Sequence, residues 1–270
     1  MANSVNTNMG ALLALRNLNV TNESLSKTQD RVSTGLRVIG AKDDASSFAI
    51  AQGIRADLKA YTAVDQALAN GKGIGDVAIA GATQISNLLT DMKKKVIEGM
   101  NAGNTASQQS ILDADFAAMK AQFQTFISNA SYNGKNLLQS TSTAATVIST
   151  ISGGTLTISS QAAIGNLSFG SLSSTTNAAS ALVDVNAAIT AVGTALGDLG
   201  ADVNSLKFQQ DFNKTVSDAV TEGLGSIVDA DLAEESAKLQ ALQVKQQLGV
   251  QSLSIANSSP QILLSLFRGG

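Results

Sequence analysis

A seven-residue repeat of large apolar side chains is the feature that most restricts how this chain can fold. Near the N-terminus, Leu18, Leu25, Val32 and Ile39 follow one another at intervals of seven, and Leu36 lies beside them. Such a repeat gives an α-helix one apolar stripe, which needs a partner helix. A matching stripe near the C-terminus consists of Leu232, Leu239, Leu242, Leu253, Ala256, Leu263 and Phe267. The sequence therefore predicts two terminal helices that seek apolar partners.

Helical periodicity continues after the first stripe. Asp44 is suited to cap a second helix that begins near Ala45, because its carboxylate can accept hydrogen bonds from the free N–H groups of a first turn. This helix is predicted to end around residues 99–103, and a third to run from about 107 to 127. Both belong to the first half of the chain.

The helical period returns in the second half, from about Asn177. We expect it to break at Gly223–Gly225, because glycine disfavours a helix interior. Asp231, followed three residues later by Glu234, has the spacing of a capping box and predicts the start of a last helix.

The middle of the chain differs in composition, because residues 136–183 contain no charged side chain and are rich in Ser and Thr. Two β-branched segments, Thr146–Ile151 and Thr155–Ile158, flank the pair Gly153-Gly154. This pattern favours a β-hairpin. A disordered Ser/Thr linker is the alternative interpretation.

Composition argues against catalysis and against several partners. The chain has no His and no Cys, so the usual general base, thiolate nucleophile and zinc or iron ligands are missing. We expect no enzymatic activity, no cofactor and no metal. A net charge of −3 and a pI near 5.0 lack the clustered basic surface that nucleic acids require, so we expect no nucleic-acid partner.

Two weaker patterns have structural explanations. Gly71–Gly75 contains three glycines and a lysine but lacks the spacing of a phosphate-binding loop, so helix irregularity or close packing is favoured. Four acidic residues near the last helix could in principle hold a hard cation, although helix capping explains them without one. They are Asp229, Asp231, Glu234 and Glu235.

The order of elements is nearly symmetric along the chain. We expect a mainly α fold: a long-helix coiled-coil rod with both termini at one pole and a small β-hairpin region at its tip. The terminal coiled-coil domain is predicted at 1–42 and 229–270, and the helical bundle at 43–135 and 177–228. The Ser/Thr-rich hairpin region, 136–176, belongs to the bundle.

Several segments resemble the bacterial flagellins, over nearly the whole chain. They are Val5-Asn6-Thr7-Asn8, Arg31–Ala45, Tyr132-Asn133-Gly134-Lys135, Ile227–Asp231 and Ser259–Leu266. The resemblance implies an extracellular filament subunit for motility, in which the terminal helices form an inner tube and the middle helices a surrounding tube. Few residues separate Leu138 from Ala179, so this is expected to be a short form without outer domains.

The resemblance also implies partners. These are further copies of the chain in a helical filament, hook-associated and cap proteins, an export chaperone on the C-terminal helix, and the gate of the flagellar type III export apparatus. The first residues lack a cleavable secretory signal, which agrees with that export route.

Two sets of functional residues are predicted. The heptad residues are expected at subunit interfaces: Leu18, Leu25, Val32, Leu36, Ile39, Leu232, Leu239, Leu242, Leu253, Leu263 and Phe267. Candidate O-glycosylation sites in the Ser/Thr-rich region are Ser140, Thr143, Ser171, Ser173, Thr175 and Thr176.

Two alternative functions stay open. One is a flagellin-like hook–filament junction protein, which pattern alone does not separate from a filament subunit. The other, more remote, is a membrane-active secretion-system translocator. Its polar faces should be basic, yet residues 1–40 carry a net charge of only +2 and residues 229–270 carry −1. No stretch reaches the roughly 18 apolar residues that span a bilayer, so we expect no membrane insertion.

Overall fold

A computed structural model describes residues 8–268, with side chains up to Ser258. The described residues are mainly helical, with two small antiparallel sheets, as the sequence predicts. Contacts divide the chain into two compact units, Met1–Ala56 with Val220–Gly270 and Asp57–Ala219. Two long helices, α2 (Ala45–Gly99) and α5 (Thr175–Val228), contribute to both.

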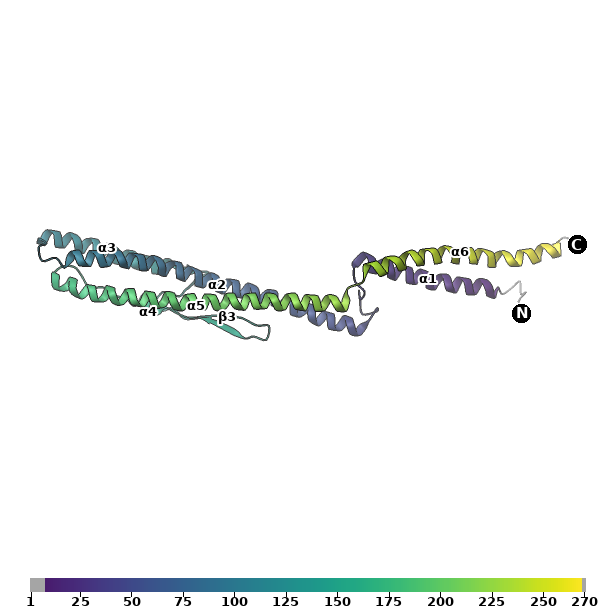
Figure 1. Cartoon of the computed structure of the whole chain (residues 1–270), viewed down its shortest axis with the longest axis horizontal. Coiled ribbons are helices and arrows are strands. Elements are labelled where there is room, and N and C mark those ends of the chain that lie inside the picture. The colour runs from purple at the N-terminus through teal and green to yellow at the C-terminus, as the bar shows by residue number, and fades with distance from the viewer. Residues whose placement is uncertain (1–7, 269–270) are drawn as a thin grey trace. The chain divides into compact units, whose positions relative to one another are not determined.

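The first unit, here called the terminal unit, is built around α1 (Met9–Thr34) and α6 (Leu232–Arg268), which lie side by side (Figure 1). The Asn8 side chain caps α1 by accepting a hydrogen bond from the Ala11 N–H at 3.0 Å. Gly35, at φ +71°, ends the helix in the left-handed conformation that glycine adopts without strain. The chain then enters residues 35–44, which precede α2 and are here called the link.

The link pairs with the segment between α5 and α6. The Arg37 N–H donates to the Val228 carbonyl at 2.7 Å, and the Ala230 N–H donates to the Gly35 carbonyl at 2.9 Å. Asp44 then caps α2, because its Oδ1 accepts from the N–H groups of Ser46 and Ser47. The predicted helix start at Ala45 is thereby confirmed.

The second unit, here called the bundle unit, packs α2, α3 (Ala106–Asn129) and α5 around a continuous core. The buried positions of α2 alternate at intervals of three and four, so a heptad seam runs along the helix. They are Val64, Leu68, Gly71, Gly75, Ala78, Ala82, Ile85, Leu89, Met92, Val96 and Gly99. The buried positions of α5 follow the same rule: Ala178, Ala181, Val185, Ala188, Val192, Ala195 and Leu199. The bundle is thus held by apolar seams of its own.

The glycines of α2 permit close packing. A Cβ placed on Gly71 would lie 2.5 Å from Val147, and one on Gly75 would lie 2.4 Å from Val203. Both distances are shorter than real Cβ contacts, so only glycine fits. The glycine-rich stretch within Gly71–Gly75 is therefore a packing feature.

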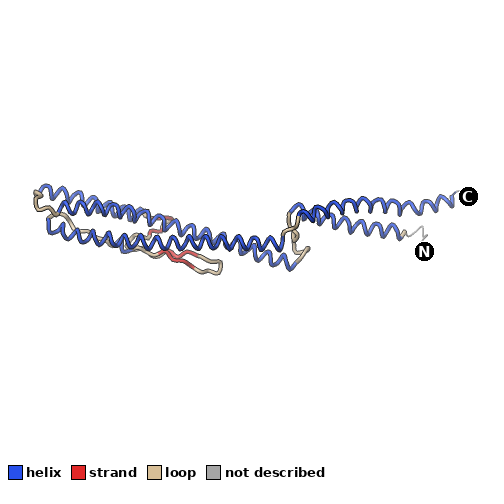
Figure 2. Tube along the Cα trace, in the orientation of Figure 1, coloured by secondary structure: helices blue, strands red, loops and turns tan. Residues whose placement is uncertain are grey.

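Two hairpins pack along the bundle (Figure 2). In the first, β1 (Ser131–Tyr132) pairs with β2 (Lys135–Asn136), and in the second, β3 (Ala145–Ile148) pairs with β4 (Thr155–Ile158). The predicted hairpin around Gly153-Gly154 is confirmed, and the alternative of a disordered linker is wrong. In the second hairpin, Ala145 and Val147 of β3 and Ile158 of β4 are buried and anchor the strands in the core.

Polar side chains of the helices hold the Ser/Thr-rich region through its backbone. Asp202 accepts from the Ser159 N–H at 2.7 Å, and Asp113 accepts from the Leu172 N–H at 2.6 Å. The buried Asn213 side chain donates to the Ser149 carbonyl at 3.2 Å. The short helix α4 (Ala162–Gly165) completes this region. The order of the Ser/Thr-rich region thus depends on charged and amide side chains of the helices.

One sequence prediction is wrong, because Gly223–Gly225 does not break α5. The helix continues through both glycines to Val228. Glycine costs a helix interior only about 1 kcal/mol, and the apolar contacts of Leu224, Ile227 and Val228 with the link stabilise the last turns. One 18-residue window of α5 also reaches a mean hydropathy of 1.4, enough by length and composition to span a membrane. The apolar positions of α5 form the bundle seam.

Candidate assembly interface

The contact between α1 and α6 is an antiparallel helix pair within one chain. The Asn8 side chain donates to the Ala256 carbonyl at 2.6 Å, and the Gln246 side chain donates to Asn22 at 2.8 Å. The facing positions on α1 are Ala11, Ala14, Leu18, Thr21, Leu25, Thr28 and Val32. Those on α6 are Glu235, Leu239, Leu242, Gln246, Gly249, Leu253 and Ala256. Both rows keep the three-and-four spacing of a heptad.

This seam mixes large apolar groups with polar and small ones. Leu25 and Leu242 are its buried apolar side chains, and they share it with the buried polar residues Thr28 and Glu235. Threonine, glutamine, glutamate and glycine at facing positions reduce the apolar area that the pair can bury. Because burial supplies most of the stability of helix pairs, the pair is weak compared with the bundle.

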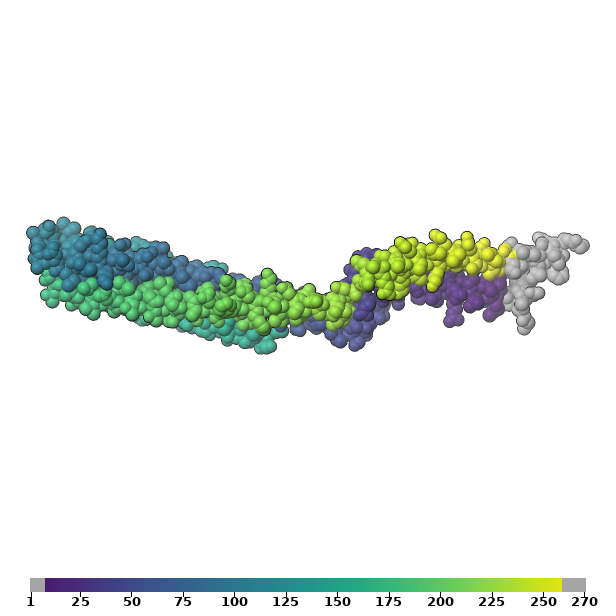
Figure 3. All heavy atoms as spheres, viewed as in Figure 1, coloured from purple at the N-terminus to yellow at the C-terminus, as the bar shows by residue number. Residues whose placement is uncertain are grey.

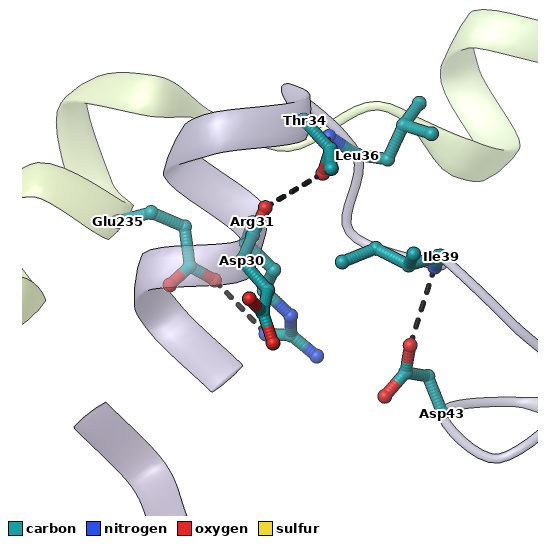
Figure 4. Close-up of polar contacts among 7 residues, drawn as sticks. All are labelled: Asp30, Arg31, Thr34, Leu36, Ile39, Asp43 and Glu235. Carbon is teal, nitrogen blue, oxygen red and sulfur yellow. Dashed lines mark hydrogen bonds and ion pairs between the residues drawn. The ribbon is translucent and has the colours of Figure 1, made fainter. Parts of the chain in front are cut away.

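A buried ion pair lies near one end of the seam (Figure 4). The Arg31 guanidinium donates to Oε1 of Glu235 at 2.9 Å, and the side chains are 26% and 10% exposed. The second carboxylate oxygen, Oε2, is buried without a hydrogen-bond partner in the described part of the chain. The ion pair thus fixes the register of the two helices, because sliding either one would leave Glu235 unpaired.

The outward faces of the pair also carry large apolar groups. Space-filling spheres show α1 and α6 in contact along their length (Figure 3). Exposed on α1 are Leu12, Leu13, Leu15 and Val20, and exposed on α6 are Val244, Leu248, Val250 and Ile255. A groove of about 620 Å³ follows α1 past Leu12, Leu15 and Val20. We call these eight residues the outward stripes.

The predicted interface residues occupy different places. Leu18, Leu25, Val32, Leu239, Leu242 and Leu253 face the partner helix within the chain. Leu36 packs in the link beside Val38, while Ile39 and Leu232 are exposed. Ile39 lines a groove of about 570 Å³ between the end of α1 and residues 39–43. The side chains of Leu263 and Phe267 lie outside the described residues. For all eleven predicted interface residues, a role between subunits stays a prediction.

The interface residues predicted from the heptad repeat do not include the outward stripes. Their signal was nonetheless present in the sequence, because Val244, Leu248 and Ile255 share one side of α6 at spacings of four and seven. A helix that is apolar on two sides has two partners to satisfy. The other terminal helix is one of these partners, and the outward stripes stay exposed in the described chain.

The acidic residues beside α6 act in the fold. Asp231 caps the helix by accepting from the N–H groups of Ala233 at 2.9 Å and Glu234 at 3.2 Å, and Glu235 pairs with Arg31. Among the described residues no cluster of three or more acidic side chains is arranged to hold a metal ion.

A weak intrachain helix pair with apolar outer faces defines a class of protein, the coiled-coil subunit that completes its packing by self-association. The comparisons make this specific. Residues 5–143 match the N-terminal helical region of bacterial flagellin, and residues 182–267 match its C-terminal helical region. The chain belongs to the bacterial flagellins, and it is a short form without outer domains.

Relatives of nearly the same length support this assignment. The flagellin FljO of Caulobacter vibrioides is 38% identical over 98% of this chain and 99% of its own length. A flagellin of Brucella melitensis is 37% identical with the same coverage. Flagellins polymerise into the extracellular filament of the flagellum and serve motility, and this chain is such a structural subunit.

Solved structures support the fold alone. Bacillus cereus flagellin aligns with a TM-score of 0.51 at 18% identity, covering 54% of this chain and 88% of that one. A putative flagellar hook-associated protein from Vibrio parahaemolyticus aligns with a TM-score of 0.58 at 14% identity, covering 69% of this chain and 100% of that one. The helical architecture is shared at these low identities.

Proposed function

We propose that the outward stripes of α1 and α6 are the surfaces through which this flagellin contacts its neighbours in the filament core. The single observation behind the proposal is that the terminal helices leave the Leu, Val and Ile side chains of the outward stripes exposed, outside the intrachain seam. Exposed apolar side chains that line one groove, as Leu12, Leu15 and Val20 do, are typical of an interaction site. Residues 1–42 and 229–270 then form the inner tube, and residues 43–135 and 177–228 form the tube around it.

The energetic argument follows from the composition of the two faces. Full burial of a Leu, Val or Ile side chain contributes roughly 1.5–3 kcal/mol, and the outward stripes already lie on formed helices. Each neighbour that covers them adds stability that the mixed seam does not supply. Assembly and completion of the terminal packing are therefore one process, and contacts that do not close into a ring extend into a filament.

The test compares substitutions on the outward stripes with one beside them. Val20→Asp and Leu248→Asp should leave the helical content of the monomer unchanged, because both side chains are exposed. Each should raise the critical concentration for seeded polymerisation by roughly tenfold or more, because a charge is buried at the contact. Circular dichroism and sedimentation of the polymer measure the two quantities.

Asn17→Asp is the matched control, since it adds the same charge to an exposed position of α1 outside the outward stripes. It should polymerise as the unaltered chain does. Normal filaments from both Val20→Asp and Leu248→Asp would refute the assignment of these surfaces.

The same stripes account for the remaining partners. Before assembly, an exposed apolar face on α6 needs cover, and an export chaperone bound along Val244, Leu248 and Ile255 would supply it. The chain is then delivered to the type III export gate. After export it contacts the cap and hook-associated proteins. A chain without His or Cys takes part in these steps as a structural element, without catalysis.

O-glycosylation is proposed for the exposed hydroxyls of the Ser/Thr-rich region. Ser140, Thr175 and Thr176 are exposed. By contrast, Thr143 accepts a hydrogen bond from Lys135 at 2.8 Å, and the hydroxyls of Ser171 and Ser173 bond each other at 3.0 Å. The three unengaged hydroxyls are the better acceptors for sugar. An intact mass of the native filament equal to the sequence mass would refute this modification.

A further inference from the structure

One tripeptide, Asn-Gly-Lys, occurs twice in this chain, at residues 70–72 and at residues 133–135. Glycine has no side chain to shield its backbone nitrogen, so an asparagine that precedes glycine is prone to attack by that nitrogen on its side-chain amide. No other asparagine of the sequence precedes a glycine. Because the two copies share their local sequence, a difference in reactivity between them must come from the structure.

The second copy forms the turn of the first hairpin. Asn133 and Gly134 connect β1 to β2, and Tyr132 pairs with Lys135 across them. Both turn residues have positive φ, +50° for Asn133 and +76° for Gly134, as a two-residue type I′ turn requires. Both are exposed. Among the residues that the structure describes, the Asn133 side chain and the Gly134 N–H have no hydrogen-bond partner. The two groups that would react are therefore free.

This turn can move without unfolding the bundle. The strands on either side of it have two residues each, and so short a hairpin opens locally at small cost. The residues around it are held by separate contacts. The Tyr132 ring lies 3.0 Å from the position of a Cβ on Gly73, and the Asn136 side chain donates to the Ile127 carbonyl at 2.6 Å. The backbone at Asn133 can thus adopt the angles that ring closure needs.

The first copy lies in the interior of α2. Each backbone N–H of such a helix donates to the carbonyl four residues earlier, so the Gly71 N–H is engaged. Gly71 is also buried against Val147. An attack on the Asn70 amide would require the helix to open at a packed position. The same three residues are therefore protected at one place and available at the other.

We propose that Asn133 is a site of spontaneous deamidation. The Gly134 backbone nitrogen attacks Cγ of Asn133, and the new C–N bond closes a five-membered succinimide ring. The bond from Cγ to the side-chain nitrogen breaks, and ammonia leaves with the proton that the Gly134 nitrogen gives up. Water then adds to either carbonyl of the ring and opens it, giving aspartate or isoaspartate. No oxidation or reduction takes place.

The product changes the turn in two ways. Every event replaces a neutral amide with a carboxylate, so the subunit gains one negative charge. Isoaspartate also lengthens the backbone by one methylene. This should disturb the pairing of Tyr132 with Lys135, because the register of a hairpin depends on its turn. The reaction needs water alone, so the modified fraction should rise with the age of a subunit in the extracellular filament.

Mass spectrometry of the full-length chain tests the proposal. The folded protein is kept in mildly alkaline buffer made with water that carries heavy oxygen, and is then digested with trypsin. Peptides 60–72 and 121–135 both end in Asn-Gly-Lys. Peptide 121–135 should gain heavy oxygen at Asn133 as two separable products, while Asn129 in the same peptide stays unchanged. Its rate should exceed that of peptide 60–72 by roughly tenfold or more, because the Gly71 N–H must first leave a packed helix.

The chain unfolded in guanidinium is the matched control. Without structure the two copies should react at equal rates, which gives the intrinsic rate of the tripeptide. Asn133→Gln is a second control and should abolish the change in peptide 121–135, because glutamine would have to close a larger ring. Equal rates at Asn70 and Asn133 in the folded chain would overturn the proposal. So would an unchanged Asn133 over the time in which the unfolded chain reacts. Neither result involves polymerisation, so the role as a filament subunit would stand.

Discussion

The bundle unit and the terminal unit share the same heptad spacing but differ in what that spacing achieves. In the bundle the seam is apolar, and large side chains such as Phe116, Phe123 and Leu89 are fully buried. In the terminal unit the seam mixes leucines with threonine, glutamine, glutamate and glycine. The leucines of the outward stripes stay exposed. The spacing of a repeat therefore decides that helices pair, and the chemistry at the repeating positions decides how strongly they pair.

This difference separates folding from assembly in one chain. The bundle can reach its final packing as a monomer, because its core is complete within residues 57–219. The terminal pair is weak until other copies cover it. Mutations in the two seams should consequently be read out by different measurements.

The largest expected effect comes from the bundle core. Phe123→Ala removes a fully buried ring that packs edge-on against Phe169 with centroids 5.1 Å apart. It should lower the free energy of unfolding of the monomer by about 3–5 kcal/mol. Urea unfolding followed by circular dichroism measures this loss. Phe208→Ala, at an exposed position, is the matched control and should change the same free energy by less than about 0.5 kcal/mol.

Equal losses from Phe123→Ala and Phe208→Ala would break the comparison. They would show that the exposed phenylalanine already packs in the monomer, and the bundle would no longer be complete without it.

A smaller effect is expected in the terminal seam. Arg31→Met leaves the Glu235 carboxylate buried without its partner. The loss should be about 2–3 kcal/mol, less than for a fully buried pair because Arg31 is partly exposed. It should appear as faster hydrogen exchange confined to α1 and α6. Arg31→Met combined with Glu235→Leu should recover the protection, since no charge is then buried.

If the double variant exchanged as fast as Arg31→Met alone, the loss would come from the packing of the Arg31 stem. The ion pair would then play no part in fixing the register of the two helices.

Sequence reasoning predicted the helices well because their signals are local. Asp44 and the apolar period after it placed the start of α2, and the β-branched segments around Gly153-Gly154 placed the second hairpin. The predicted break at Gly223–Gly225 failed, because contacts with the distant link outweigh the local cost of glycine. Long-range packing of this kind leaves no periodic trace in the sequence.

The interface was predicted less completely. The heptad residues were identified, but the sequence does not state which partner faces them, and Leu18, Leu25 and Leu242 meet within one chain. Leu12, Val20 and the other outward residues lie between heptad positions, and their exposure in the structure shows that the intrachain pair does not cover them. Their role becomes visible when the intrachain partner has been located.

The smallest effect concerns the cap of α2, in the terminal unit. Hydrogen bonds from the Ser47 hydroxyl and N–H hold the pKa of the Asp44 carboxyl below its ordinary value of 3.8. A lowered pKa means that the cap stabilises the fold above that value and that this contribution disappears as the pH falls through the lower, folded value. Asp44→Asn keeps a capping oxygen and should remove this acid sensitivity while leaving the neutral-pH helix signal intact.

The measurement is an acid titration of helical content for Asp44→Asn, with Asp57→Asn as the control that removes an exposed carboxylate further along α2. Asp44→Asn should unfold less steeply than the unaltered chain below the pH at which free aspartate protonates, and Asp57→Asn should follow the unaltered curve. Superimposable curves for all three chains would show that the Asp44 cap does not stabilise the start of α2.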